Sequence, residues 1–289
     1  MLRMQSDTGW WLITHPDHAR LAGEFARAWG NTRFRRPEPR VRVLHGISSH
    51  DDGWRKRDNH PSITRQGKPS AFSAELVGKY SAFEEIDLPE YLTVRERAVQ
   101  LIAERDAYAA LLIAMHTFSL LTDHADRETI LPQQLPLLDK FLEDLQEYQQ
   151  LLLENIEADS QLLEYEKDAQ RIQENFQLLQ ACDNLSLLSC VAYDSPANLL
   201  HPLALNDGGK AEVKVYPIAS RHFRLEPWPF AQEKLQFEIP ARHVKGKLFG
   251  SSAELEKAYN AAPEEKLSVT LSEFDKSATR NSRILTFSE

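Results

Sequence analysis

The sequence contains little cysteine. Only Cys182 and Cys190 occur among its 289 residues, and both fall on one predicted helix. A helix rises about 1.5 Å per residue, so their Cα atoms would lie roughly 12 Å apart, too far for a disulfide. We therefore expect reduced thiols and a cytoplasmic location.

Long hydrophobic runs are also missing. The longest uninterrupted apolar stretch, residues 108–115, is far shorter than the roughly 20 residues that span a bilayer. The N-terminal segment turns polar too early for a secretory signal, and the mean hydropathy of −0.47 agrees. We expect a soluble protein without a membrane partner.

Positive charge is in deficit. The 34 lysines and arginines are outnumbered by 43 aspartates and glutamates, which gives a net charge of −9. A general nucleic-acid binder needs a basic face to displace counterions, so this class is not expected. A glycine-rich phosphate loop and a G-x-S-x-G nucleophile elbow are absent too, which argues against the enzyme classes that use them.

What is present is mostly helical periodicity. Thr14 resembles an N-cap, with Pro16 and Asp17 in the first turn, so the sequence predicts a helix up to Trp29 after a short apolar lead-in at residues 10–13. Further helices are predicted over residues 40–51, 72–83 and 93–122. Two more long helices are expected within 136–191, with a bend near 159–160.

The pattern changes near residue 195. Alternating polar and apolar residues predict strands around 212–216, 235–239 and 267–271, and a short helix is expected over 252–261. We therefore predict a mainly α protein, with a helical bundle over residues 1–195 and a small β-rich C-terminal region over 196–289 packed on it. The length suits one large domain plus a smaller module.

Ionisable residues interrupt the apolar stripes of four predicted helices. An unpartnered buried carboxylate or imidazole costs several kcal/mol, and a divalent cation would satisfy all of them together. Taken singly, each histidine is more often a satisfied core residue, and each aspartate can cap a turn. Their joint occurrence favours a metal centre. The residues concerned are His18, His50, Asp51, His116 and Asp183.

The order His18, His50-Asp51, Asp183 resembles the H…HD…D arrangement of the HD-domain superfamily of metal-dependent phosphohydrolases. Together with the strings at residues 11–19, 50–54, 183–187 and 228–230, it is similar to an uncharacterised bacterial family related to that superfamily. The resemblance implies an HD-like helical bundle in which these four residues bind a metal.

In dinuclear members of the superfamily, the aspartate of the HD pair bridges a second metal and two further histidines follow. Here His116 can supply one of them. His124 would lie about two helical turns further along and is expected to miss the site. The resemblance thus leaves a mononuclear or incomplete dinuclear centre. A Gly-Tyr-Pro motif, typical of cyclic-dinucleotide phosphodiesterases in the superfamily, is absent.

The resemblance implies hydrolysis of a phosphate ester, a phosphomonoester or a nucleotide-like phosphodiester, by a water activated on a divalent ion (Mn, Mg, Zn, Ni or Fe). Asp52 is a candidate general base, although it can equally be solvated. The candidate binding residues for a small anionic substrate lie in a basic loop, which can also be a solvated loop balancing local acid. These are Arg55, Lys56, Arg57 and Lys68.

Two other functions are compatible with the sequence. One is a di-iron oxygenase on the same scaffold, and the other is a non-catalytic binding or regulatory protein that a metal only stabilises. The long helices of residues 136–191 could support a homo-oligomer, although core packing explains them equally well. His15 is expected to be a surface residue of the first helix cap.

Overall fold

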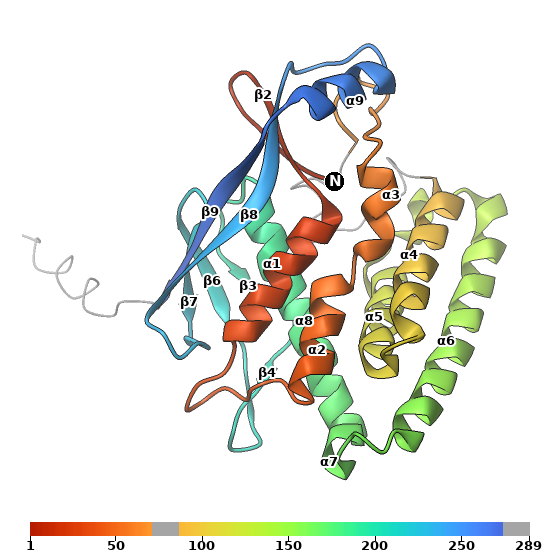
Figure 1. The fold of residues 1–289 in the computed structure, drawn as a ribbon, viewed down its shortest axis with the longest axis vertical. Coiled ribbons are helices and arrows are strands. Elements are labelled where there is room, and N and C mark those ends of the chain that lie inside the picture. The colour runs from red at the N-terminus through yellow and green to blue at the C-terminus, as the bar shows by residue number, and fades with distance from the viewer. Residues whose placement is uncertain (71–86, 274–289) are drawn as a thin grey trace, which may run out of the picture.

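The computed structural model describes residues 1–70 and 87–273. A curled mixed sheet forms one side of the molecule, and helices form the other (Figure 1). Helices α1 and α8 lie next to the sheet, and α2, α5, α4 and α6 follow further away from it. The predicted helix over residues 72–83 falls outside the described residues.

The sheet corrects the expectation of a mainly α, all-helical HD-like bundle, because helices make up only about half of the structure. Its seven strands run in the order β1-β2-β8-β9-β7-β6-β3. Neighbours are antiparallel except β7 and β9, which are parallel. Strands β4 (Leu203–Ala204) and β5 (Lys210–Ala211) pair in a second sheet. The strands of the large sheet are β1 (Leu2–Gln5), β2 (Gly9–Ile13), β3 (Ala197–Asn198), β6 (Lys214–Ala219), β7 (His222–Glu226), β8 (Lys234–Lys245) and β9 (Glu264–Glu273).

The N-terminal strands join the sheet through a long-range contact. The apolar lead-in expected at residues 10–13 is strand β2, which pairs on one side with β1 and on the other with β8. The sheet therefore contains strands from both sides of residue 195, where the two predicted regions meet.

Three predicted helices have the expected positions. Thr14 caps α1 by accepting a hydrogen bond from the Asp17 amide at 3.1 Å, as its sequence context predicts. Helix α2 also starts where expected but ends two residues early, and α9 has the predicted bounds. Their bounds are α1 (His15–Ala28), α2 (Arg40–Ser49) and α9 (Ser252–Ala261).

The single helix predicted over residues 93–122 is wrong, because the structure has two helices there. Helix α4 (Leu88–Ala103) ends before Asp106, whose side chain accepts a hydrogen bond from the Ala109 amide and starts α5 (Ala107–Ser119). Apolar periodicity continues across the break and conceals it. A π-helical turn, η4 (Leu120–His124), follows α5.

The two long helices expected within residues 136–191 are present. They are α6 (Leu135–Ala158) and α8 (Ala169–Cys190), and the chain turns between them through α7 (Glu164–Lys167). Shorter helical turns are η1 (Asp52–Trp54), α3 (Arg55–Asp58), η5 (Arg127–Thr129) and η6 (Pro132–Gln134). Within residues 1–70 and 87–273, no helix combines the length and apolarity needed to cross a membrane.

One apolar core joins the helices to the sheet. Phe25 of α1 meets Phe237 of β8 edge to face, with ring centroids 4.9 Å apart. Trp29, at the end of α1, contacts Phe230 in the same way at 5.5 Å. These contacts fix α1 on the sheet, and α1 carries the first of the candidate metal ligands.

Candidate metal centre

The five predicted ligands come from four helical segments that pack together. His18 lies in the first turn of α1, His116 in α5 and Asp183 in the middle of α8. His50 and Asp51 follow the last residue of α2. All five residues are buried, with exposed fractions between 1% and 6%.

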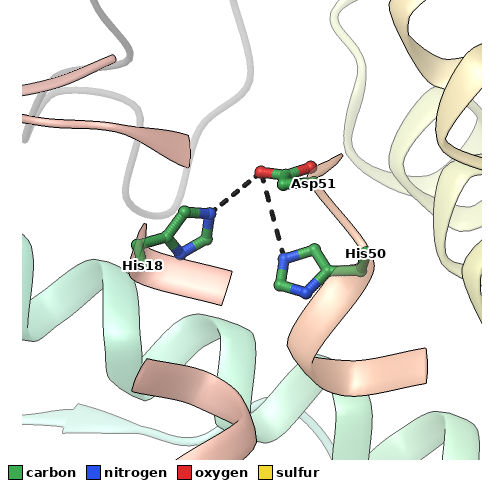
Figure 2. Close-up of side chains that lie close together, drawn as sticks. All are labelled: His18, His50 and Asp51. Carbon is green, nitrogen blue, oxygen red and sulfur yellow. Dashed lines mark hydrogen bonds and ion pairs between the residues drawn. The ribbon is translucent and has the colours of Figure 1, made fainter. Parts of the chain in front are cut away.

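Consecutive residues of a helix point about 100° apart, yet His50 and Asp51 both face the centre. The reason is that α2 ends at Ser49. Asp51 has φ −116° and ψ 16°, in the sparsely populated bridge region where many active-site residues lie. The chain thus changes direction between the two residues, and Figure 2 shows His18, His50 and Asp51 pointing toward one another.

The ligand atoms form a connected set. His18 Nε2 lies 2.9 Å from Asp51 Oδ2, and His50 Nε2 lies 3.9 Å from that same oxygen. On the other side, His50 Nε2 is 3.2 Å from Asp183 Oδ1, and His116 Nε2 is 3.7 Å from Asp183 Oδ2.

These separations suit metal coordination. Bonds of about 2.1 Å to an ion place neighbouring ligand atoms about 3.0–3.4 Å apart. Two groups could each hold an ion, with all their ligand atoms within 4.8 Å of one another. They are His18, His50 and Asp51, and His50, His116 and Asp183, so they share His50.

Hydrogen bonding fixes the tautomer of His18. Ser186 Oγ donates its hydrogen to the carbonyl oxygen of Asp183 at 2.8 Å. Because a serine hydroxyl has a single hydrogen, this oxygen must accept from His18 Nδ1, which lies 2.8 Å away. In a neutral His18 ring the Nε2 lone pair then faces the Asp51 carboxylate.

His50 is fixed in the same way. Its Nδ1 lies 2.7 Å from the carbonyl oxygen of Ile47, which can only accept. Its Nε2 therefore faces Asp183 and Asp51 with a lone pair when the ring is neutral. Two lone pairs aimed at carboxylates require positive charge between them, either a proton on each ring or a metal ion. Histidines that bind metals typically donate their other N–H to such an acceptor.

The charges of the cluster raise or lower its pKa values. Burial lowers the pKa of His50, but the carboxylates of Asp51 and Asp183 outweigh burial and raise it to about 9. Burial raises the pKa of Asp183, whereas the hydrogen bond and the charge of His50 contribute most to bringing it down to about 2. Asp183 is thus ionised at neutral pH, as a metal ligand must be.

His116 remains neutral. Burial lowers its pKa to about 3 against the opposing charge of Asp183. Within the described part of the chain, its buried Nδ1 has no hydrogen-bond partner. A neutral imidazole beside a carboxylate is a suitable ligand for a borderline or transition metal. Together, these buried histidines and aspartates form groups that could hold a metal ion.

Arg95 of α4 is a further member of the cluster that the sequence analysis missed. Its Nη1 donates to Asp51 Oδ1 at 2.6 Å, and its Nε donates to the hydroxyl of Tyr91 at 3.0 Å. The guanidinium lies over the rings of Trp54 and Tyr91, 5.5 and 5.1 Å from their centroids. Burial raises the pKa of Asp51, but Arg95, His50 and His18 together outweigh this effect and keep it well below its ordinary value.

A sequence signal for Arg95 exists. It lies four residues after Tyr91 and four before Val99, on the face of α4 that is otherwise apolar. A single arginine on such a stripe indicates a buried carboxylate partner, in the same way as the histidines indicate one another.

The prediction that His15 lies on the surface is wrong. It is buried, with an exposed fraction of 2%, because the Asp58 carboxylate supplies a partner from α3. The His15 amide donates to Asp58 Oδ2 at 2.6 Å, and its ring stacks on Trp54 with centroids 4.3 Å apart. Burial lowers the pKa of His15 to about 4. His15 and Asp58 thus support Trp54, which in turn contacts Arg95.

The remaining candidate residues are less buried than the five ligands. Asp52 starts η1 and forms an ion pair with Arg55 at 2.9 Å, and both are partly exposed. Lys56 is exposed. Arg57 forms an ion pair with Glu90 at 3.3 Å. Lys68 is half-buried and belongs to a turn closed by a hydrogen bond from the Thr64 amide to its carbonyl oxygen.

Comparison with known proteins gives a family without a known function. The sequence model of the family described as "Protein of unknown function (DUF3891)" matches residues 1–246. Comparison with curated proteins and with solved structures gave no match.

Proposed function

We propose that this chain, which belongs to the DUF3891 family, is a metal-dependent hydrolase of phosphate esters. The observation that carries the proposal is the buried set of His18, His50 and Asp51 with His116 and Asp183. Their separations, their fixed tautomers and their ionised carboxylates all support the binding of a divalent ion. The identity of the ion, among Mn, Mg, Zn, Ni and Fe, belongs to the proposal.

The choice of hydrolysis rests on the order of the ligands along the chain. His18, the adjacent pair His50-Asp51 and the distant Asp183 follow the order found in HD-domain phosphohydrolases. We propose a relation to that superfamily on the ligand set alone, since the overall architecture here contains the large curled sheet. A bound divalent ion would lower the pKa of a water molecule and neutralise charge on a phosphoryl group.

The protein residues would have separate tasks. His18, His50, Asp51 and Asp183 hold the ion, and His116 supplies a fifth, neutral donor. Ser186 and the carbonyl of Ile47 orient two of the imidazoles. Arg95 adds a fixed positive charge beside Asp51, which favours an anionic substrate in an otherwise acidic protein.

The more exposed residues are proposed for substrate contact. Asp52 adjoins Asp51 in the sequence and would act as the general base. Arg55 and Lys56, together with Arg57 and Lys68, would attract a small phosphomonoester or a nucleotide-like phosphodiester. Alanine at Arg55 or Lys56 should raise KM with little effect on kcat, since both are exposed and neither is one of the proposed metal ligands.

The test begins with elemental analysis of protein purified without chelator. We expect near-stoichiometric metal in the wild type and loss of it in Asp183→Asn, while His60→Ala, an exposed histidine, keeps full occupancy. Removal of a direct ligand should weaken binding by more than about 100-fold, the upper range for loss of an outer partner. Equal occupancy in Asp183→Asn and wild type would contradict the site.

The activity test uses bis(p-nitrophenyl) phosphate and p-nitrophenyl phosphate with and without added Mn²⁺. Hydrolysis that needs the ion and disappears in Asp183→Asn supports the proposal, whereas hydrolysis retained in that variant indicates a contaminating enzyme. Two irons per chain with oxygen consumption would replace the hydrolase by an oxygenase. Metal binding without turnover on a broad ester panel would favour a binding or regulatory protein.

A further inference from the structure

The two ligand groups cannot both use His50. Its Nδ1 donates to the carbonyl of Ile47, so only the Nε2 lone pair is left for a metal. One lone pair binds one ion. Yet His50 belongs both to the group with His18 and Asp51 and to the group with His116 and Asp183. With His50 committed to one ion, a second ion would need a further donor, and the second oxygen of the Asp51 carboxylate is the candidate.

The second carboxylate oxygen of Asp51 already accepts a hydrogen bond from Arg95. Its Oδ2 faces His18 and His50, whereas its Oδ1 accepts from Arg95 Nη1 at 2.6 Å. To bridge two metals through both of its oxygens, Asp51 would offer one oxygen to each. Here a guanidinium takes the place beside Oδ1.

Arg95 is held firmly in that place. It is buried, with an exposed fraction of 3%, and its Nε donates to the Tyr91 hydroxyl. The ring faces of Tyr91 and Trp54 contact the guanidinium, which favours a cation at this position. Displacing it would break the short ion pair with Asp51 inside the protein, which is unfavourable for a buried charge.

The charges of the cluster also indicate a single ion. As ligands, the three imidazoles are neutral, so Asp51, Asp183 and Arg95 give a net charge of −1. A single divalent ion changes this to +1. A second would make the buried cluster +3, with no further carboxylate among the five ligands to balance it, and uncompensated buried charge is strongly unfavourable.

We propose that the centre holds a single divalent ion and that the Arg95 guanidinium occupies the place of a second cation. The inference rests on the metal centre of the proposed function and specifies its composition. It assigns to Arg95 a task that a second metal would otherwise perform, which is to hold Asp51 in one orientation and to add positive charge for an anionic substrate.

The test is the number of Mn²⁺ ions bound per chain at saturation, measured by equilibrium dialysis and by electron paramagnetic resonance. We expect one ion and the six-line spectrum of isolated Mn²⁺ in the wild type. Arg95→Met removes the charge at similar length and should admit a second ion, with an exchange-coupled spectrum. Arg95→Lys keeps the charge and should stay at one.

The matched control is Arg97→Met, an exposed arginine on the same helix, which should stay at one ion. Two ions in the wild type would overturn the inference even if Arg95→Met failed to fold. A folded Arg95→Met that binds only one ion would overturn it too.

Activity does not enter this measurement, so the two proposals can fail separately. One ion per wild-type chain without any ester hydrolysis contradicts the hydrolase and leaves the single-ion centre in place. Two coupled ions in the wild type together with hydrolysis contradict the single-ion centre and leave the hydrolase in place. Absence of Mn²⁺ binding, with no other divalent ion found by elemental analysis, contradicts the metal centre and, with it, both proposals.

Discussion

The ring of His18 is oriented by Ser186, which lies 168 residues further along the chain with its Oγ 2.8 Å from His18 Nδ1. The same hydroxyl donates to the carbonyl oxygen of Asp183. One serine on α8 thus holds a ligand of α1 in its metal-binding tautomer and contacts the backbone of a second ligand.

Ser186→Ala should therefore weaken metal binding. Loss of such an outer partner typically costs about 10–100-fold in affinity, and we expect this range, with helical content unchanged in circular dichroism. The control is Ser189→Ala, because Ser189 is equally buried on α8 but donates to the Leu185 carbonyl. Equal Mn²⁺ affinity in the two variants would show that Ser186 does not orient His18.

Asp51 and Arg95 should be strongly coupled in stability. In chelator, Asp51→Ala leaves the buried guanidinium without its carboxylate and should lower the free energy of unfolding by about 3–5 kcal/mol. The double variant Asp51→Ala/Arg95→Met should recover a large part of this loss. Urea unfolding of the four proteins of the cycle measures the coupling, and additive losses would mean that the 2.6 Å contact carries no coupling energy.

Gly53 should tolerate no side chain. A Cβ there would lie 2.2 Å from the Val94 carbonyl oxygen and 2.9 Å from the Ala98 amide nitrogen, both backbone atoms of α4. Gly53→Ala should lower the free energy of unfolding by more than about 2 kcal/mol, because the added methyl group forces the backbone to move. It should also weaken metal binding, because it pushes the segment after Asp51 away from the helix that carries Arg95.

A glycine with adaptable surroundings provides the comparison. At Gly250 a Cβ would meet only the end of the flexible Glu254 side chain, at 3.2 Å. Gly250→Ala should change stability by less than about 0.5 kcal/mol. Similar melting temperatures for the two alanine variants would contradict the close approach of η1 to α4.

His45 should make stability depend on pH. Its Nδ1 is 2.9 Å from Asp106 Oδ2, and this hydrogen bond raises its pKa above 6.5 against the effects of burial and of Arg42. The folded state then binds the proton more tightly, so the contribution is present below pH 6.5 and is lost as the pH rises through the folded-state pKa. The resulting gain in the free energy of unfolding is below about 1 kcal/mol, because 38% of the His45 side chain is exposed.

The check is urea unfolding of wild type and His45→Gln in chelator, at about pH 5.5 and about pH 8.5. Wild type should be the more stable protein at the lower pH, and the difference should shrink at the higher one. A difference that grows with pH would reverse the sign and contradict the ion pair.

Chelation should lower the melting temperature. An ion that binds only the folded state stabilises it by about 2.7 kcal/mol at a concentration of 100 times its Kd. Differential scanning fluorimetry with Mn²⁺ or with chelator should show this loss in the wild type and almost none in His50→Ala. A melting temperature that is equal in the two solutions would argue against a bound ion.

Local signals in the sequence are sufficient to predict much of the helical part of the fold. The cap at Thr14, the long Leu-rich helices and the bounds of α9 follow from capping and periodicity. The break between α4 and α5 was missed, because Asp106 reads as one polar residue in a continuing apolar pattern.

The sheet could not be predicted to the same extent. Short strands such as β1 and β2 gain their stability from pairing with distant segments, and residues 10–13 alone do not indicate that β8 lies beside them. The expectation of a mainly α protein followed from counting local patterns. A sheet assembled from both ends of the chain leaves only weak local signals.

The candidate site was more accessible to sequence reasoning than the fold around it. Buried polar residues on apolar stripes need partners, and this rule alone predicts that the five ligands lie close together. They are His18, His50, Asp51, His116 and Asp183. The same rule applied to Arg95 would have found the guanidinium. His15 was misjudged because its partner, Asp58, lies in a short helical turn that has no apolar stripe.

Strand β2 has a consequence for how the protein is made. It leads directly into α1 and His18, and it pairs with β8, so that Trp10 lies opposite Val244. Asp183, too, emerges from the ribosome long after His18. Strand β2 and His18 are therefore synthesised well before their partners. Strand β2 cannot complete its pairing until the segment up to β8 has left the exit tunnel. Completion of the centre is accordingly a late event in folding.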